Sequence, residues 1–136
     1  MLYGNIHATA SPGETTMADS TTTLQELKAI MATFVTQRGW DQFHNPKNIS
    51  MALAIEAAEL MERLQWVSTQ DSWDTMEEYR THIEHELADV LSLILAFANA
   101  TNIDISDVFM RKMALNQAKY PQDKAYGTWD KNKMKL

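Results

Sequence analysis

The sequence has no cysteine and is poor in glycine and proline. Without cysteine the chain has no disulfide, no thiolate metal ligand and no cysteine nucleophile, so its fold depends on a hydrophobic core. Four glycines and three prolines make about 5% of the 136 residues, where about 12% is usual. So few turn residues argue against a loop-rich β-sandwich or barrel and favour helices.

Basic side chains and long apolar runs are also scarce. Twelve Lys and Arg stand against 18 Asp and Glu, a net charge of -6, which argues against binding a nucleic acid polymer through its phosphates. The longest apolar run, Val90 to Ala98, is interrupted by Ser92 and is far shorter than the ~20 residues that span a bilayer, so no membrane segment is expected. No Lys or Arg precedes Lys28, and no secretory signal is evident, so we expect a cytoplasmic protein.

The chain is predicted to be one domain with an extension at each end. Residues 1–20 are rich in Ser, Thr, Gly and Ala and are predicted to form a flexible N-terminal tail, in which Met17 could be the natural start. Residues 21–121 hold the helical domain. Residues 122–136 form a lysine-rich C-terminal extension that either trails in solvent or covers a neighbouring active site.

Hydrophobic residues at helical spacing predict four helices. The predicted ranges and end signals are residues 23–38, ended by Gly39; 49–66, capped by Asn45 or Asn48; 75–100, opened by a capping box of Thr75 and Glu78; and a helix capped by Asp104 and ended at Tyr120 before Pro121. Four helices joined by short links predict an all-α protein with a four-helix bundle core.

Four acidic residues lie where apolar side chains are expected. Glu56 and Glu59 are three residues apart on the second predicted helix, and Glu86 and Asp89 are three apart on the third, so each pair forms one acidic patch. Each patch lies on or beside the apolar stripe of its helix, and Glu86 shares its side with Val90. We therefore expect Glu86 to point into the bundle.

Converging carboxylates need a compensating charge, because two like charges about 4 Å apart repel by about 4 kcal/mol at an effective dielectric of about 20. Protonation, nearby Arg or Lys, or divalent cations can supply it. Ligands that are all oxygen suit Mg²⁺ best, with Mn²⁺ as a substitute. One Glu-x-x-Glu pair is usually an exposed helix face, but two such pairs beside apolar stripes on consecutive helices favour a metal site.

Histidine does not take part in this predicted metal site. A ferritin-like di-iron site requires Glu-x-x-His on two helices, and no glutamate here has a histidine three residues later. His82 and His85 are three apart and could bind a metal, but His85 lies about 100° around the helix from Glu86. For both histidines we expect a structural or surface role.

The fourth predicted helix carries a polar stripe of Lys112, Asn116 and Lys119, with Tyr120 beside it. Two cations and an amide on one line suit phosphate oxygens. Lysines near a helix C-terminus are commonly just solvated, because the helix dipole favours them there. Beside an acidic metal site, however, the stripe favours a metal-bound polyphosphate as substrate.

The acidic motif Glu56-x-x-Glu59, 26 intervening residues and Glu86-x-x-Asp89 resembles the signature of the MazG-like all-α nucleoside triphosphate pyrophosphohydrolases. Residues 43–48, the Gln65-Trp66 pair and residues 112–121 are most similar to the dCTP pyrophosphatase branch of that family. The resemblance covers about residues 24 to 121.

This resemblance implies a Mg²⁺-dependent enzyme that cleaves a nucleoside triphosphate, a dNTP such as dCTP, to the monophosphate and pyrophosphate, and so sanitises the nucleotide pool. It implies a homodimer or homotetramer. The residues that it assigns are the metal ligands and catalytic carboxylates Glu56, Glu59, Glu86 and Asp89; the phosphate-binding residues Lys112, Asn116, Lys119 and Tyr120; and the candidates for base and sugar binding, Trp40, His44 and Trp66, whose alternative role is packing.

The chain also departs from its dCTP-specific relatives, which have a His at the position of Met31 and a Tyr at that of Leu93. A pocket for several deoxynucleotides or for a modified base is therefore as consistent with the sequence as a cytosine pocket. Two alternatives remain. One is a phosphohydrolase for a phosphoribosyl-linked ATP, although Trp40 and Trp66 favour a free dNTP; the other is a non-enzymatic acidic helical module that binds a basic partner in a salt-sensitive way.

Overall fold

Helices make up all the regular secondary structure in the part of the chain that the computed structural model describes, residues 17–128 and 130. In order they are α1 (Leu24–Gln37), the 3-10 helix η1 (Trp40–Gln42), α2 (Pro46–Glu62), α3 (Ser72–Glu78), α4 (Arg80–Thr101), α5 (Ile105–Lys119) and α6 (Gln122–Ala125). The predicted all-α class is confirmed. Most of the predicted N-terminal tail, residues 1–16, and much of the C-terminal extension, residues 129 and 131–136, lie outside the described residues.

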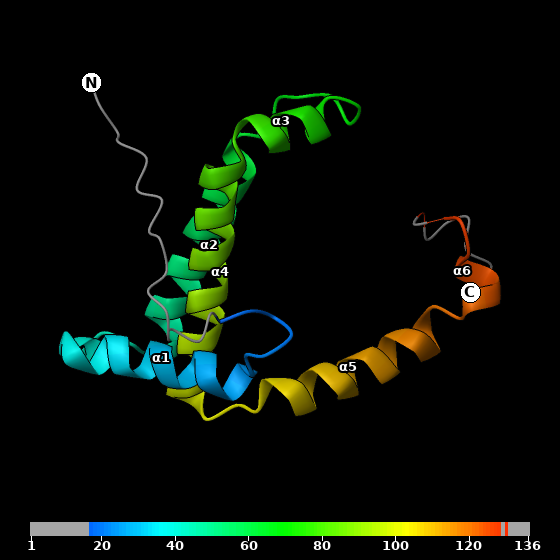
Figure 1. Cartoon of the computed structure of the whole chain (residues 1–136). Coiled ribbons are helices and arrows are strands. Elements are labelled where there is room, and N and C mark those ends of the chain that lie inside the picture. Colours follow the sequence, from blue (N-terminus) through cyan, green and yellow to red (C-terminus); the bar gives the residue numbers. More distant parts are fainter. Residues whose placement is uncertain (1–16, 129, 131–136) are drawn as a thin grey trace, which may run out of the picture.

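The centre of the molecule is the pair α2 and α4, which run antiparallel side by side, while α1 crosses the pair near one end (Figure 1). The buried side chains among the described residues are all apolar: Val35, Ile49, Ile83, Leu95, Ala96 and Ala98. They come from α1, α2 and α4, so burial of apolar surface holds these three helices together.

Local side-chain bonds set most helix ends near where the sequence predicts them, although the second helix spans Pro46–Glu62 and not residues 49–66. Asn45 caps α2 by accepting from the backbone N–H of Asn48, and Asp104 caps α5 in the same way. Gly39 follows the end of α1 with a φ of 63°, a conformation that glycine adopts without strain. One further cap comes from Thr23, which forms a capping box with Glu26 at the start of α1.

The third predicted helix, residues 75–100, is two helices in the structure. The break falls at Tyr79, whose φ of -106° and ψ of 21° are not helical. The predicted capping box of Thr75 and Glu78 is wrong, because Thr75 lies inside α3 and its hydroxyl donates to the carbonyl of Asp71 at 3.0 Å. The helix starts earlier because the segment from Ser68 turns at Asp71, where the Ser68 hydroxyl donates to the Asp71 carboxylate.

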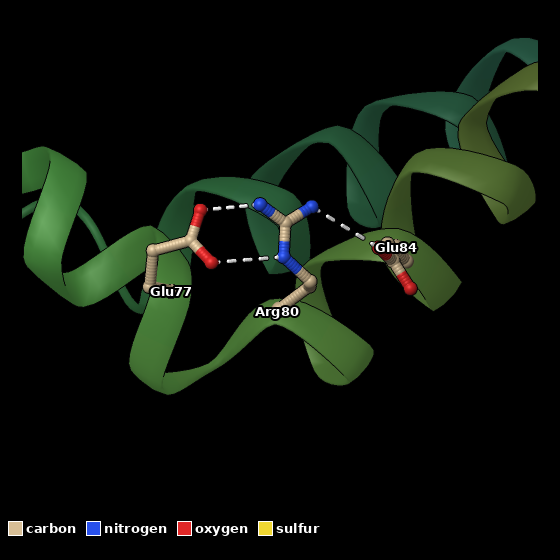
Figure 2. Close-up of polar contacts among 3 residues, drawn as sticks. All are labelled: Glu77, Arg80 and Glu84. Carbon is tan, nitrogen blue, oxygen red and sulfur yellow. Dashed lines mark hydrogen bonds and ion pairs between the residues drawn. The ribbon is translucent and has the colours of Figure 1, made fainter.

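An ion-pair network spans the break between α3 and α4. Arg80 donates to the carboxylate of Glu77 on α3 and to that of Glu84 on α4 (Figure 2). All three side chains are at least half exposed, so the network contributes little to stability. Its consequence is that Arg80 is engaged with these two glutamates at the head of α4.

Helix α5 leaves the end of α4 at an angle of 105° and runs away from the α2 and α4 pair (Figure 1). The four predicted helices are thus present as α1, α2, α4 and α5, but the fourth does not close a bundle against the other three within one chain. Among the described residues no single helix has the length and apolarity to cross a membrane; α4 and α5 meet that standard only as a pair, across their bend.

Two side chains connect α1 to the C-terminal end of α4. The Asn99 amide donates to the carbonyl of Lys28 at 2.9 Å, and the Lys28 ammonium donates to the carbonyl of Ile103 at 3.1 Å. Both bonds are partly buried and join residues more than 70 positions apart. They therefore fix α1 across the helix pair.

The Asn99 bond generates a stability prediction. Asn99→Ala is expected to lower the free energy of unfolding by about 0.5–1.5 kcal/mol, because it removes a partly buried hydrogen bond between α4 and α1, while the Lys28 carbonyl keeps its bond within α1. Asn102→Gly is the matched control: Asn102 ends α4 with a φ of 55°, which glycine adopts freely, so a change within about 0.5 kcal/mol is expected. Urea denaturation measures both, and equal losses would contradict the role of Asn99.

Candidate metal and substrate site

The direction of the acidic side chains follows from the burial of isoleucines on the same helices. Ile49 and Ile83 are buried on α2 and α4. Glu56 follows Ile49 by two helical turns, and Glu86 follows Ile83 by about one turn. Each carboxylate therefore lies on the same side of its helix as a buried isoleucine. As predicted, Glu86 points inward, with its side chain only 15% exposed.

Three carboxylates from these two helices converge. Glu56 on α2 and Glu86 and Asp89 on α4 each offer one oxygen, and the three oxygens lie within 4.8 Å of one another. Glu56 and Glu86 are half-buried and Asp89 is exposed, so the group opens to solvent on one side. We call these three residues the acidic cluster.

The electrostatics of the acidic cluster are unfavourable without a cation. Partial burial raises the pKa of the Glu56 carboxyl above its ordinary value. Charge repulsion raises this pKa further, with contributions in the order Glu59, Asp89 and Glu86. Because the ligand atoms are all carboxylate oxygens at one point, they fit a divalent cation of the type that prefers oxygen.

Glu59 is the predicted ligand that stands apart. It is exposed on α2 and contributes no oxygen to the acidic cluster, although its charge reaches Glu56. Three of the four predicted metal ligands are thus brought together, and the place of Glu59 in the ligand set stays a prediction.

A cavity of about 550 Å³ adjoins the acidic cluster between α1, α2 and α4. Glu56 and Asp89 form part of its wall. The rest is mainly apolar, with Ser92 the one hydroxyl: Leu27, Ile30, Met31, Phe34, Ala52, Ala88, Leu91, Ser92, Leu93 and Leu95. Met31 and Leu93, the two positions at which the resemblance predicts a departure from dCTP-specific relatives, both line it.

The predicted base-binding residues lie elsewhere. Trp40 packs edge-on against Phe34 with ring centroids 5.8 Å apart, His44 lines a separate cavity with Asp41, and Trp66 is 88% exposed beyond the end of α2. None of the three lines the cavity beside the acidic cluster. Of the α1 side chains that do line it, only Met31 was tied to base selection by the resemblance; Leu27, Ile30 and Phe34 were predicted only as an apolar helix face, and no motif marks them as binding residues.

The predicted phosphate-binding residues are on or at the end of α5. Lys112, Asn116 and Lys119 belong to that helix, and the Lys119 ammonium lies 5.3 Å from the ring centroid of Tyr120. Since α5 runs away from α2 and α4 (Figure 1), one chain does not bring them to its own acidic cluster.

Comparisons with known proteins agree on one family. A model of the MazG-like family matches residues 51–133. Human dCTP pyrophosphatase 1 is 33% identical over 117 residues, which are 83% of this chain and 67% of that protein. The mouse protein of the same name is 35% identical, over 73% of this chain and 59% of its own length.

A solved structure agrees with the family. A pyrophosphatase from Archaeoglobus fulgidus DSM 4304 superposes with a TM-score of 0.70 and 36% identity, covering 72% of this chain and 92% of that one. These matches confirm the resemblance that the acidic motif and its flanking segments predict. The chain belongs to the MazG-like family.

Proposed function

We propose that the chain is a Mg²⁺-dependent pyrophosphohydrolase that cleaves a deoxynucleoside triphosphate to the monophosphate and pyrophosphate. The observation that carries the proposal is the acidic cluster, three carboxylate oxygens within 4.8 Å, at the wall of an apolar cavity. The family, the relatives named dCTP pyrophosphatase 1 and the pyrophosphatase structure support it. A cavity of about 550 Å³ is also of the size of small-molecule sites.

In this proposal Glu56, Glu86 and Asp89 hold the metal ion, and Glu59 joins the ligand set through a change of side-chain rotamer. The bound ion supplies charge stabilisation on the phosphate oxygens and polarises the attacking water. The carboxylates on α2 and α4 would hold the ion, and one of the glutamates or a metal-bound hydroxide would activate that water. Because Glu56, Glu86 and Asp89 come from two helices that pack against each other, their backbone positions are fixed before substrate arrives.

The cavity takes the base and sugar while the phosphates lie at the acidic cluster. Met31, Leu93 and the other apolar side chains cannot hydrogen-bond a base edge, and Ser92 is the one hydroxyl in the wall. Apolar pockets separate similar ligands by about 10–200-fold, whereas pockets that hydrogen-bond their ligand reach about 10⁴ or more. We therefore assign the enzyme a range of dNTP substrates.

The reaction is tested by chromatographic product analysis with each dNTP and NTP. Monophosphate and pyrophosphate are expected in Mg²⁺ and not in EDTA, with kcat/KM for the dNTPs spread over less than about 200-fold. Asp89→Asn is expected to lower kcat at least about 100-fold by removing a charge on the metal. Glu84→Gln, an exposed acid on the same helix, is the control. Folded protein that turns over no nucleotide in Mg²⁺ would contradict the proposal and favour a binding module.

Metal binding is tested by the stability of the protein itself. Because the pKa of Glu56 is raised, the ionised form of this side chain destabilises the metal-free fold. The contribution of Glu56 to the free energy of unfolding is therefore fully present below its ordinary pKa of 4.5 and is lost as pH rises through the raised pKa. At neutral pH in EDTA, Glu56→Gln is therefore expected to have a higher Tm than wild type. In the Glu56→Gln variant, the rise in Tm that Mg²⁺ gives the wild-type protein is expected to disappear.

The matched control for this thermal experiment is Glu62→Gln, an exposed glutamate on the same helix outside the acidic cluster. It is expected to keep both the wild-type Tm in EDTA and the rise with Mg²⁺. A Glu56→Gln protein that melts lower than wild type in EDTA, yet still gains stability from Mg²⁺, would exclude Glu56 as a ligand.

We further propose that the working unit is a homodimer or homotetramer in which α5 of one chain completes the site of another. Exposed apolar surface supports this: Leu87, Leu91 and Ile94 form a stripe on α4 that is 56%, 40% and 39% exposed. Phe109 and Leu115 on α5 are exposed as well. Surface of this kind is typical of protein interfaces, and a second copy would also bring Lys112, Asn116 and Lys119 to the phosphates.

This composite site is tested by complementation between two inactive variants. Chains with Glu56→Gln and chains with Lys112→Ala, expressed together, are expected to recover about a quarter of wild-type activity, because one site in four draws both parts from intact chains. Glu56→Gln with Asp89→Asn is the control and should recover none, since both changes lie in one acidic cluster. No recovery in the first mixture would place both parts of the site in a single chain.

A further inference from the structure

His82 lies one helical turn before Glu86 on α4, and its imidazole faces that carboxylate. The Nδ1 atom is 3.5 Å from Glu86 Oε1. It is fully buried and has no hydrogen-bond partner among the described residues, although the whole side chain is 35% exposed. A buried polar atom without a partner is rare, and it costs free energy unless a partner is reached in some state of the protein.

Glu86 is the partner that the geometry offers. A carboxylate has two oxygens, so one can accept from an imidazole N–H while the other binds a cation. His82 itself is outside the acidic cluster, whose three oxygens come from carboxylates alone. A decrease of about 0.6 Å in the separation of Nδ1 and Oε1 would reach the usual length of an N–H···O bond.

Glu86 also needs such support. Its carboxylate lies among two others that repel it, and a free carboxylate rotates away from like charges. Ligand carboxylates in metal sites are commonly held by a hydrogen bond from a neighbouring group, and loss of that bond typically weakens metal binding about 10–100-fold.

We infer that His82 is a positioning residue for the metal site: its Nδ1–H donates to Glu86 Oε1 and so holds the other oxygen of Glu86 toward the ion. This inference rests on the proposed role of Glu86 as a metal ligand. It replaces the purely structural or surface role that the sequence suggests for this histidine. His85, the second histidine of the pair, is exposed and is given no part in the site.

The test is direct titration of the full-length protein with Mg²⁺, and with Mn²⁺, by calorimetry in the absence of nucleotide. His82→Ala is expected to raise the Kd of the metal about 10–100-fold. His82→Leu fills a similar volume without a donor and is expected to lose as much. His82→Asn carries an amide N–H close to the position of Nδ1–H and should recover most of the affinity.

Two controls separate positioning from packing. His85→Ala changes a histidine beside Glu86 and is expected to keep the wild-type Kd. Urea denaturation in EDTA measures stability apart from the metal, and His82→Leu is expected to be as stable as wild type there. A structural histidine would show the opposite pattern, with lower stability and an unchanged Kd in the leucine variant.

The outcomes distinguish this inference from the function on which it rests. If wild type binds the metal and His82→Ala and His82→Leu bind it equally well, the positioning role is overturned while the metal site stands. If His82→Asn binds as weakly as His82→Leu, the hydrogen bond is overturned. If wild type binds neither Mg²⁺ nor Mn²⁺, the proposed metal site and the role of His82 are both overturned.

Discussion

The constraint on which the rest of the structure depends is the repulsion between carboxylates that α2 and α4 hold close together. Apolar burial at Ile49 and Ile83 fixes the two helices in register, and the same register forces Glu56 and Glu86 to meet. The core therefore supplies the free energy that keeps like charges within 4.8 Å of one another. The pKa of Glu56 is raised because its carboxyl is partly buried and lies near these other carboxylates. A divalent cation at this point would relieve the repulsion between the carboxylates, and that relief would contribute to the affinity of the protein for the metal.

A second consequence follows from how little apolar surface one chain buries. The buried side chains belong to α1, α2 and α4, whereas α5 carries Phe109 and Leu115 into solvent as it leaves α4 at 105°. A helix that cannot bury its apolar face within its own chain can bury it against another copy. The lysines of α5 would be carried along with that face. Assembly and completion of the site would then be one event, with the same helix serving both.

The sequence predicts the parts of this site that depend on local periodicity. Glu86 could be placed inside because its position relative to Val90 is set by the helix repeat alone. The break at Tyr79 could not be predicted, because Thr75 and Glu78 have the spacing of a capping box whether they start a helix or lie inside one. The direction of α5 and the surroundings of Trp66 could not be predicted from the sequence either. They depend on contacts between distant segments, which no local pattern encodes.

The metal ligands and the other residues of the cavity wall come in part from different helices, so a chain of this fold could keep its reaction while its substrate changes. The carboxylates come from α2 and α4, whereas four of the cavity-lining residues come from α1, which the Asn99 and Lys28 bonds attach across the pair. A change of side chain at Met31 would alter what the cavity can hydrogen-bond without moving a metal ligand. Leu93 is on α4 yet a full turn beyond Asp89, so it too can change independently. Base selection is thus free to vary in this fold as long as α2 and α4 stay in register.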